Sequence, residues 1–343
     1  MKKQIIVTGA NGFLGANLCN HLKKKGFDIS CLVREKANIT LLNKNHKIYC
    51  CDYNDKASLE KILRNFDVVI HLAALTKAKN FQSFYDVNVA LTKDIVNIVN
   101  KSNKCKYFIF MSSQAAVGPS KGMCVKVESD IEAPISWYGI SKYLAENIVK
   151  QCQKKWTIIR PSSIYGEGDK DFLFFFKMIN CNIAPITGKF DKYISLIYVG
   201  EIVEIIRNIL CNYIDYNDEE YMNLLVHASD GYSYKIEEFI SILSSALKKR
   251  CFTFRVSDNS LLKLSNILDF FYNFTDKVSI LNSQKAIELT QENWLIDNKK
   301  PLYEFHAKGI KQIATNYKSK MLNNNLYVNL RKTYLWYQKN GYL

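Results

Sequence analysis

The chain has 343 residues, 48% of them hydrophobic, so it can bury a sizeable core and form one large domain with a smaller one appended. A formal charge of +15 is compatible with nucleic acid, a membrane surface or an anionic ligand as partner. The lysines lie in short scattered groups and form no basic helix or arginine stripe, which indicates compositional bias, and nucleic acid is not an expected partner. Ten cysteines without a C-x-x-C pair indicate neither a zinc site nor a disulfide framework. We expect reduced thiols, a cytoplasmic protein without a signal peptide, and no stable membrane anchor, because no run approaches about 20 apolar residues.

The chain opens on an apolar run, residues 5–7, that leads into a turn with glycines at 9, 12 and 15. This pattern predicts a strand, a tight turn and a helix. Glycines let the backbone turn sharply and approach a pyrophosphate, which the helix N-terminus then holds, so we expect dinucleotide binding, with a plain strand-to-helix turn as the alternative. The expected cofactor contacts in this turn are Thr8, Gly9, Asn11, Gly12, Phe13, Leu14 and Gly15.

Strands and helices alternate through the first half of the chain. Further strands are expected at 27–33, 48–51, 67–72, 107–111 and 156–159, and helices at 39–43, 55–64, 81–100 and 137–152, the last capped by Ser136. These strands are almost wholly apolar, as a parallel sheet covered by helices on both faces requires. The pattern therefore predicts an α/β fold with a Rossmann-type, doubly wound parallel sheet.

The alternation loosens after residue 161. Helices are expected at 172–179, 199–212, 235–249 and 261–274, and strands at 222–226 and 252–256. We expect an NAD(P)-binding domain over 1–165 and a smaller mixed α/β substrate-binding region over 166–343, interwoven with the end of the sheet. The three consecutive asparagines at 323–325 are expected in a surface loop.

Two residues bear on the choice of cofactor. The second strand ends at Arg34, where an NAD site normally carries an acid that binds the adenosine ribose. An arginine there accommodates a 2′-phosphate, so NADP is favoured over NAD, with an exposed arginine beside an unselective site as the alternative. Asp52 closes the third strand and either accepts a hydrogen bond from the adenine amine or stabilises a turn. His71 closes the fourth strand with no second ligand at a metal spacing, so no metal site is expected.

Tyr138 and Lys142 lie four residues apart on an expected helix, and Ser112 and Ser113 follow the fifth strand. Side chains at i and i+4 share one helix face, although Y-x-x-x-K also occurs by chance. A phenol has a pKa near ~10, so an adjacent ammonium and a cationic nicotinamide are needed to favour phenolate near neutral pH. We expect Lys142 to supply that ammonium, Tyr138 to exchange a proton with the substrate, and Ser113 to hold the substrate oxygen.

With these motifs in sequence, the chain resembles an extended short-chain dehydrogenase/reductase of the NAD(P)-dependent epimerase/dehydratase type. The matching segments are TGANGFLG at 8–15, CDYND at 51–55, HLAAL at 71–75, Asn88-Val89 with Thr92, RPSSIYGEGD at 160–169, and Trp294, Asp297 and residues 336–341 near the end. The resemblance implies that Ser113, Tyr138 and Lys142 are catalytic. It also implies a homodimer through the helices at 81–100 and 137–152. The further cofactor contacts that it implies are Tyr53, Leu72, Ala73, Ala74, Asn88, Ser112, Pro161 and Ser163.

The chain departs from this family pattern in three places. Sugar-nucleotide members carry an R-D-F/I motif whose arginine binds a substrate phosphate, whereas this chain reads YISL at 193–196. The 4,6-dehydratases carry Thr-Asp-Glu where this chain has Ser113, Gln114 and Ala115, so dehydration is not expected. The apolar segment 261–274 suits the mouth of a site for an apolar ligand, although core or dimer packing explains it equally well.

The first hypothesis is an NADP-linked oxidoreductase that interconverts a secondary alcohol and a ketone of a small-molecule substrate. Its pattern is most similar to the dihydroflavonol-reductase-like and 3β-hydroxysteroid-dehydrogenase-like branch. The alternative is an epimerase that transiently oxidises a nucleotide sugar with bound NAD, and the missing arginine argues against it. A third possibility is a non-catalytic NADP-sensing protein, against which the intact Ser113, Tyr138 and Lys142 argue.

Overall fold

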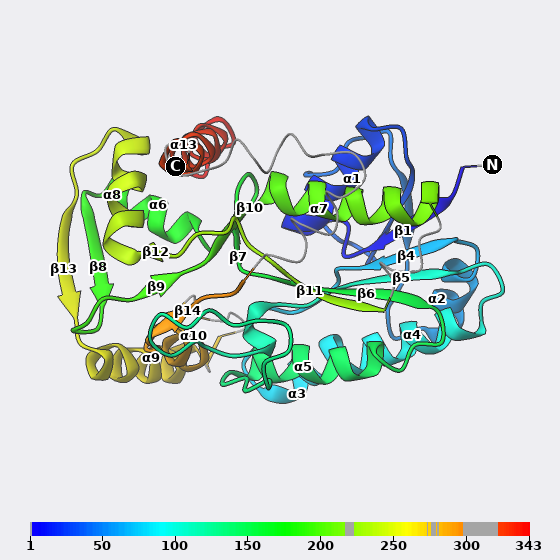
Figure 1. Cartoon of the computed structure of the whole chain (residues 1–343), viewed down its shortest axis with the longest axis horizontal. Helices are drawn as coiled ribbons and strands as arrows, with labels where there is room; N and C mark the ends of the chain where they lie inside the picture. Colours follow the sequence, from blue (N-terminus) through cyan, green and yellow to red (C-terminus); the bar gives the residue numbers. More distant parts are fainter. Residues whose placement is uncertain (1, 217–222, 273, 276–278, 280, 298–321) are drawn as a thin grey trace. The chain divides into compact units, whose positions relative to one another are not determined.

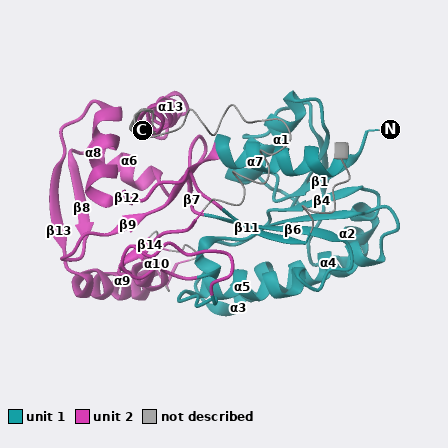
Figure 2. Cartoon of the chain, in the orientation of Figure 1, with its two compact units in different colours: residues 1–117, 131–161, 200–227 teal, residues 118–130, 162–199, 228–343 magenta. Residues whose placement is uncertain are grey.

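The chain forms two units, each assembled from three separate segments (Figure 2). In this computed structural model, unit 1 comprises residues 1–117, 131–161 and 200–227, and unit 2 comprises 118–130, 162–199 and 228–343. The structure describes residues 2–216, 223–272, 274–275, 279, 281–297 and 322–343. The predicted domain boundary at residue 165 therefore differs from the division into these units, because residues 200–227 of the second half belong to unit 1.

A seven-stranded sheet forms the centre of unit 1, with the order β11-β6-β5-β4-β1-β2-β3 (Figure 1). Its strands are β1 (Gln4–Thr8), β2 (Asp28–Val33), β3 (Lys47–Cys50), β4 (Val68–His71), β5 (Tyr107–Met111), β6 (Lys155–Pro161) and β11 (Leu224–Ala228). Every neighbouring pair from β3 to β6 is parallel. This order confirms the doubly wound, Rossmann-type sheet that the alternation of elements predicts.

Helices cover both faces of this sheet, α1 and α7 on one and α2, α4 and α5 on the other (Figure 1). Their bounds are α1 (Phe13–Lys24), α2 (Lys56–Leu63), α3 (Phe81–Phe84), α4 (Leu91–Lys101), α5 (Trp137–Val149) and α7 (Val199–Cys211). Ile6, Val69 and Phe108 on the strands are fully buried beneath Ala145 and Val149 of α5. The two-sided cover explains why the strands are apolar throughout rather than alternating.

The described part of unit 1 also contains three short helical segments. They are η1 (Tyr85–Ala90), η2 (Gln114–Ala116) and η3 (Asn212–Tyr216). The predicted helix over 81–100 is present, but η1 is a π-helical turn between α3 and α4. The predicted helix over 39–43 is wrong, because the Asn20 side chain binds this segment as a turn: its amide donates to the Leu41 carbonyl (2.9 Å) and accepts from the Asn43 N–H (3.0 Å).

Unit 2 is built from short strand pairs and helices. β7 (Ser163–Tyr165) pairs with β10 (Leu196–Tyr198), and β8 (Ile183–Thr187) pairs with β13 (Phe252–Val256), both in parallel. β9 (Tyr193–Ile194) lies between the antiparallel β12 (Tyr234–Lys235) and the parallel β14 (Asn293–Trp294). The helices in the described part of unit 2 are α6 (Leu173–Asn180), α8 (Ile236–Leu247), α9 (Asp258–Tyr272), α10 (Ser283–Leu289) and α13 (Leu322–Lys339). Short strands without a strict alternation are the reason that most of them escape sequence analysis.

Two expectations in the second half need correction. The asparagines at 323–325 lie in α13 rather than in a loop, because this helix buries Leu326, Leu330 and Tyr337, and such packing outweighs the poor helix propensity of asparagine. The strand expected at 222–226 is β11, which runs from Leu224 to Ala228, and residue 222 lies outside the described residues. Within the described part of the chain, no helix combines the length and hydrophobicity needed to cross a bilayer.

Candidate active site

The glycine turn after β1 is built so that side chains would not fit. Gly9 has φ 66°, and a Cβ added to it would lie 2.7 Å from the Ala73 nitrogen. A Cβ on Gly15 would overlap the carbonyl oxygen of Gly9. Gly12 is the N-cap of α1 and has no side chain that could cap the N–H groups of the first helical turn. These features fit a dinucleotide pyrophosphate at this helix N-terminus.

The remaining predicted residues of the turn lie beside it. Phe13 and Leu14 begin α1 and are half-buried, and the Asn11 amide donates to the Asn38 carbonyl (3.2 Å) in the segment after β2. Thr8 ends β1 and is buried. Asn11 therefore joins the glycine turn to the segment that carries Arg34.

Tyr53 connects the glycine turn to the end of β2. Its hydroxyl donates to the Leu32 carbonyl (3.1 Å) and accepts from the Gly9 N–H (3.3 Å). Burial raises the pKa of Tyr53 to about 12, while the nearby Arg34 charge acts to lower it. Arg34 itself is exposed just beyond β2. The Asp52 carboxylate accepts bonds from the Asn54 backbone and side chain (3.0 and 3.1 Å). Of the two roles considered for Asp52, these bonds correspond to stabilising a turn.

The loop after β4 is tied to β1 through His71. The His71 Nδ1 lies 2.7 Å from the Thr8 hydroxyl and its Nε2 lies 3.0 Å from the Thr92 hydroxyl. Complete burial, with the Lys142 charge as a smaller cause, lowers the pKa of His71 to about 3, so this imidazole is neutral near pH 7. The Thr8 oxygen in turn accepts a bond from the Ala73 N–H (3.3 Å). Leu72, Ala73 and Ala74 are thereby held next to the glycine turn.

Asn88 links the same loop to α5. Its amide binds both backbone groups of Leu75 (2.8 and 2.9 Å) and donates to the Ser141 hydroxyl (2.9 Å), which donates to the Tyr138 carbonyl (2.7 Å). Only 1% of Asn88 is exposed. The described bonds therefore give Asn88 a positioning role between the loop and the helix that carries Tyr138.

Ser113 immediately precedes η2, which packs on α5, the helix that carries Tyr138. Ser113 is the N-cap of η2, and its hydroxyl accepts a bond from the Ala115 N–H (3.1 Å). A Cβ on Gly139, the residue after Tyr138, would overlap the Ala115 carbonyl oxygen. Ser136 caps α5 by accepting from the Gly139 N–H (3.1 Å), as predicted. Glycine at 139 thus allows the backbone after β5 to lie against the first turn of α5.

Lys142 lies one turn beyond Tyr138 and is only 2% exposed. Among the described residues, its ammonium lies over the Phe110 ring, 4.2 Å from the centroid, and meets no hydrogen-bond acceptor. Burial lowers the pKa of Lys142 from 10.5 to about 7, although the Glu146 carboxylate acts in the opposite direction. A buried lysine with a pKa near neutrality, next to a tyrosine, is typical of a catalytic site.

A buried ion-pair network lies behind Lys142. Arg160, at the end of β6, donates to both carboxylate oxygens of Glu146 (2.8 and 2.6 Å), and neither side chain is exposed. Arg160 also binds Glu132 (2.8 Å), and the Ser112 hydroxyl donates to Glu146. Ser112 thus contacts Glu146. Pro161 ends β6 in unit 1. Ser163 begins β7 in unit 2, so the place of Ser163 among the cofactor contacts stays a prediction.

Comparison with known proteins decides the family. The model of the NAD dependent epimerase/dehydratase family matches residues 5–223, more than half of the chain. The chain belongs to this family. The match begins at β1 and extends through the whole of the network around Lys142.

The relatives of this family member include both epimerases and oxidoreductases. It is 30% identical over 234 residues (63% of this chain, 67% of the other) to N-acetyl-alpha-D-glucosaminyl-diphospho-ditrans,octacis-undecaprenol 4-epimerase of Escherichia coli O157:H7. It is 24% identical over 296 residues (84% and 85%) to ceramide reductase of Caulobacter vibrioides. A solved UDP-glucuronic acid 4-epimerase from Bacillus cereus, in complex with UDP-glucuronic acid and NAD, shares the fold, with TM-score 0.73, 18% identity and coverage of 98% and 99%. Membership thus supports an enzyme of the NAD-dependent type without deciding between epimerase and reductase.

Sequence reasoning missed three residues of this family member's site. Gly139 was visible as a glycine inside a predicted helix, which signals a close approach of another backbone. Glu146 lies four residues after Lys142, but its burial could not be read from spacing. Arg160 stood in the matching RPSSIYGEGD segment without an assigned partner, because its bond to Glu146 joins a strand to a helix 14 residues earlier.

Proposed function

We propose that the protein is an NAD(P)-dependent oxidoreductase that interconverts a secondary alcohol and a ketone, with Tyr138 as the acid and base. The observation that carries this proposal is the burial of Lys142, which is 2% exposed and lies one helical turn from Tyr138. A buried ammonium there favours the deprotonated phenol and loses little to solvent screening.

Each of the three residues Tyr138, Ser113 and Lys142 has a separate role in the proposed reaction. Tyr138 donates its proton to the ketone oxygen during reduction and recovers it during oxidation. Ser113, held at the N-cap of η2, donates a hydrogen bond to the same oxygen. Lys142 lowers the pKa of Tyr138 and binds the hydroxyls of the nicotinamide ribose. The glycine turn of α1 holds the pyrophosphate, and the bound nicotinamide supplies or accepts the hydride.

NADP is the cofactor that we favour, because Arg34 stands at the end of β2 without a carboxylate in its place. Its charge reaches Tyr53, which in turn binds Gly9 of the turn. Thermal shift at matched concentrations of NADPH and NADH tests this choice, since stabilisation grows as RT ln(1 + [L]/Kd). We expect a larger shift with NADPH and a reversed or absent difference in Arg34→Asp. Equal shifts in the unmodified protein would refute NADP preference.

The substrate that we favour has no diphosphate. Residues 193–196, which include β9, carry no arginine for a substrate phosphate, and charge-assisted bonds to that group would be unmade. The ceramide reductase relative supports the reductase. The 4-epimerase relative supports the alternative, an epimerase that uses NAD. A homodimer and a cytoplasmic location stay predictions.

Calorimetric titration of UDP-sugars into protein saturated with cofactor separates the two activities. The reductase predicts no binding in the micromolar range and predicts oxidation of NADPH with ketones that lack a nucleotide. Micromolar binding of a UDP-sugar would favour the epimerase and contradict the reductase.

A further inference from the structure

Helix α9 of unit 2 presents an apolar face to solvent. Its exposed apolar side chains are Leu264 (47% exposed), Ile267 (54%), Phe270 (60%) and Phe271 (62%), followed by Phe274 (76%) just after the helix. The spacing of 264, 267, 271 and 274 places them on one helix face. The ring centroid of Phe270 lies 5.7 Å from that of Phe271 and 5.4 Å from that of Phe274. We call these five residues the α9 face.

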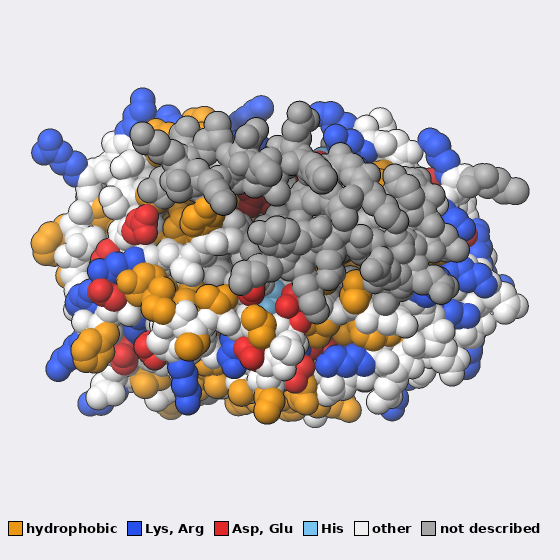
Figure 3. All heavy atoms as spheres, in the orientation of Figure 1, with side chains coloured by type: hydrophobic (Ala, Val, Ile, Leu, Met, Phe, Trp, Pro, Cys, Tyr) orange, Lys and Arg blue, Asp and Glu red, His pale blue; other side chains and the backbone are white. Residues whose placement is uncertain are grey.

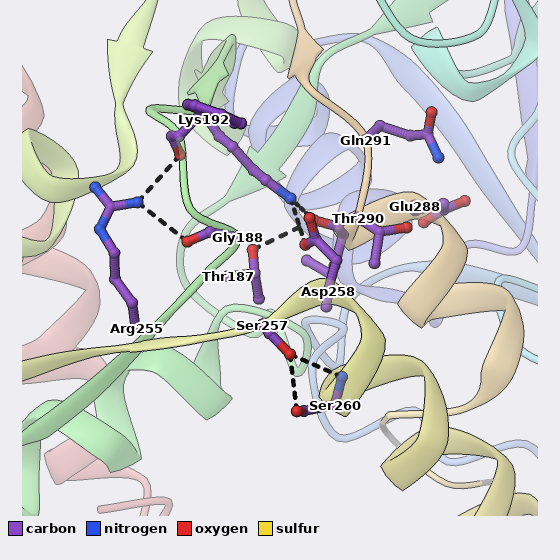
Figure 4. A network of polar contacts seen from close by, with 12 residues as sticks. Thr187, Gly188, Lys192, Arg255, Ser257, Asp258, Ser260, Glu288, Thr290 and Gln291 are labelled. Carbon is purple, nitrogen blue, oxygen red and sulfur yellow. Dashed lines mark hydrogen bonds and ion pairs between the residues drawn. The ribbon is translucent and has the colours of Figure 1, made fainter.

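The two carboxylates of α9 bind partners within unit 2. Asp258, at its start, binds the Lys192 ammonium (2.9 Å), which also donates to the Leu289 carbonyl (Figure 4). Asp269 accepts a bond from the Ser283 N–H (2.8 Å) at the start of α10. Both carboxylates of the helix are thus engaged within unit 2. Among the described residues of α9, Lys263 is an exposed charged residue next to the apolar residues of the α9 face.

The apolar composition of the α9 face limits the kinds of molecule that can bind it. Figure 3 shows hydrophobic side chains among charged ones on this face of the molecule, and Phe252 of the preceding β13 is 70% exposed. A contiguous exposed aromatic patch marks a contact with another molecule. The net charge of +15 and the exposed Lys263 on α9 complement an anionic surface.

We propose that the α9 face docks on an anionic lipid surface. The phenylalanines enter the boundary between headgroups and acyl chains, and Lys263, supported by the net positive charge, is attracted to the anionic headgroups. The association is peripheral and reversible, since the apolar contact is one face of one helix. It does not depend on the reaction catalysed at Tyr138.

Co-sedimentation of the full chain with vesicles tests this proposal. Vesicles of phosphatidylcholine alone are compared with vesicles that contain an equal share of phosphatidylglycerol. We expect binding to the mixed vesicles that weakens with salt and falls by about tenfold or more in the double variant Phe270→Ser, Phe271→Ser. The matched control is the double variant Ile131→Ser, Leu335→Ser, which removes two exposed apolar side chains elsewhere (86% and 49% exposed) and leaves binding unchanged. Lys263→Glu weakens binding to mixed vesicles only.

Three outcomes would overturn the proposal. They are no binding to mixed vesicles, equal binding by both double variants, and a concentration-dependent dimer in sedimentation velocity that only Phe270→Ser, Phe271→Ser abolishes while vesicles do not bind. The last would assign the α9 face to a second copy of the chain. None of these measurements uses turnover, so they fail or succeed separately from the proposed reductase activity.

Discussion

Helices α5 and α9 invert the usual distribution of side chains in opposite ways. Helix α5 buries Lys142 and Glu146, two charged residues that a surface helix normally exposes. Helix α9 exposes Phe270 and Phe271, two residues that it normally buries. The difference lies in their partners: Glu146 is paired with Arg160, whereas the exposed rings meet solvent.

This contrast separates two kinds of functional signal. A buried charge costs several kcal/mol unless bonds compensate it, so the Arg160–Glu146 pair holds Glu146 in place beside Lys142. An exposed aromatic face costs the folded chain little and acts only when another molecule covers it. Substitutions in α5 should therefore alter turnover and folding, and substitutions in α9 should alter neither.

The largest effect is expected at Tyr138. Tyr138→Phe removes one oxygen, and the loss of a positioned acid lowers kcat by about 10²–10⁴-fold. The Kd of the cofactor should scarcely change, because the glycine turn is untouched. Steady-state turnover and cofactor titration measure both quantities. If kcat stayed near normal under conditions where chemistry limits the rate, another residue would be the acid.

Breaking the buried pair behind the site should have the next largest effect. Arg160→Met leaves the Glu146 carboxylate buried without its partner, and the free energy of unfolding should fall by about 3–5 kcal/mol. Lys150→Met serves as a control, because Lys150 also binds Glu132 (3.4 Å) but its side chain is 36% exposed. That variant should lose no more than about 1 kcal/mol in denaturant unfolding. Equal losses in the two variants would show that burial of the pair is not what matters.

A smaller effect concerns the pH dependence of stability in the cofactor-free protein. The folded chain loses the Lys142 proton near pH 7 and the unfolded chain only near 10.5, so between these values the unfolded state binds more protons and stability rises with pH. Lys142→Met removes this contribution. We expect the variant to be most stable relative to the unmodified protein below pH 7, and this advantage to shrink as pH rises. Urea unfolding from about pH 6 to about pH 9 measures it. Parallel profiles would contradict a lowered pKa of Lys142.

The smallest effect is expected on α9. Phe271→Ser should change the free energy of unfolding by less than about 0.5 kcal/mol, because 62% of this side chain is already exposed. Denaturant unfolding checks this value beside Arg160→Met. A loss of 2 kcal/mol or more, on the scale of a core truncation, would mean that the ring packs within the fold and would weaken the contrast between the two helices.

Much of unit 1 was predictable because its elements carry local signals. Apolar strands, the glycine turn and the Ser136 cap each depend on residues close in sequence, and the structure places them within a few residues of the predicted bounds. The helix prediction at 39–43 failed because the conformation of this segment is set by Asn20, a residue on a different element. The prediction of a loop at 323–325 failed for a similar reason, since burial of the leucines of α13 outweighs the poor helix propensity of the asparagines at its start.

The candidate site was predictable only in part. Spacing placed Tyr138 and Lys142 on one face of α5, and order along the chain placed Ser113 after β5. The pairing of Glu146 with Arg160 and the fit of Gly139 against Ala115 depend on contacts between different elements, which no local pattern records. The bonds of Asp258 to Lys192 and of Asp269 to Ser283 likewise join α9 to other elements, and no local pattern records them.

The interleaving of the two units constrains how this chain can be recombined. Strand β11 forms the edge of the cofactor sheet beside β6, and α7 contributes Glu204, which binds His21 of α1 at 2.9 Å. Both elements come after residue 162, within the half of the chain that a gene fusion would naturally exchange to transplant substrate specificity. A chimera with a single junction near residue 162 would therefore also replace the edge strand and a covering helix of its own nucleotide-binding sheet. A graft of unit 2 that preserves this sheet requires junctions on both sides of residues 200–227, as well as around 118–130.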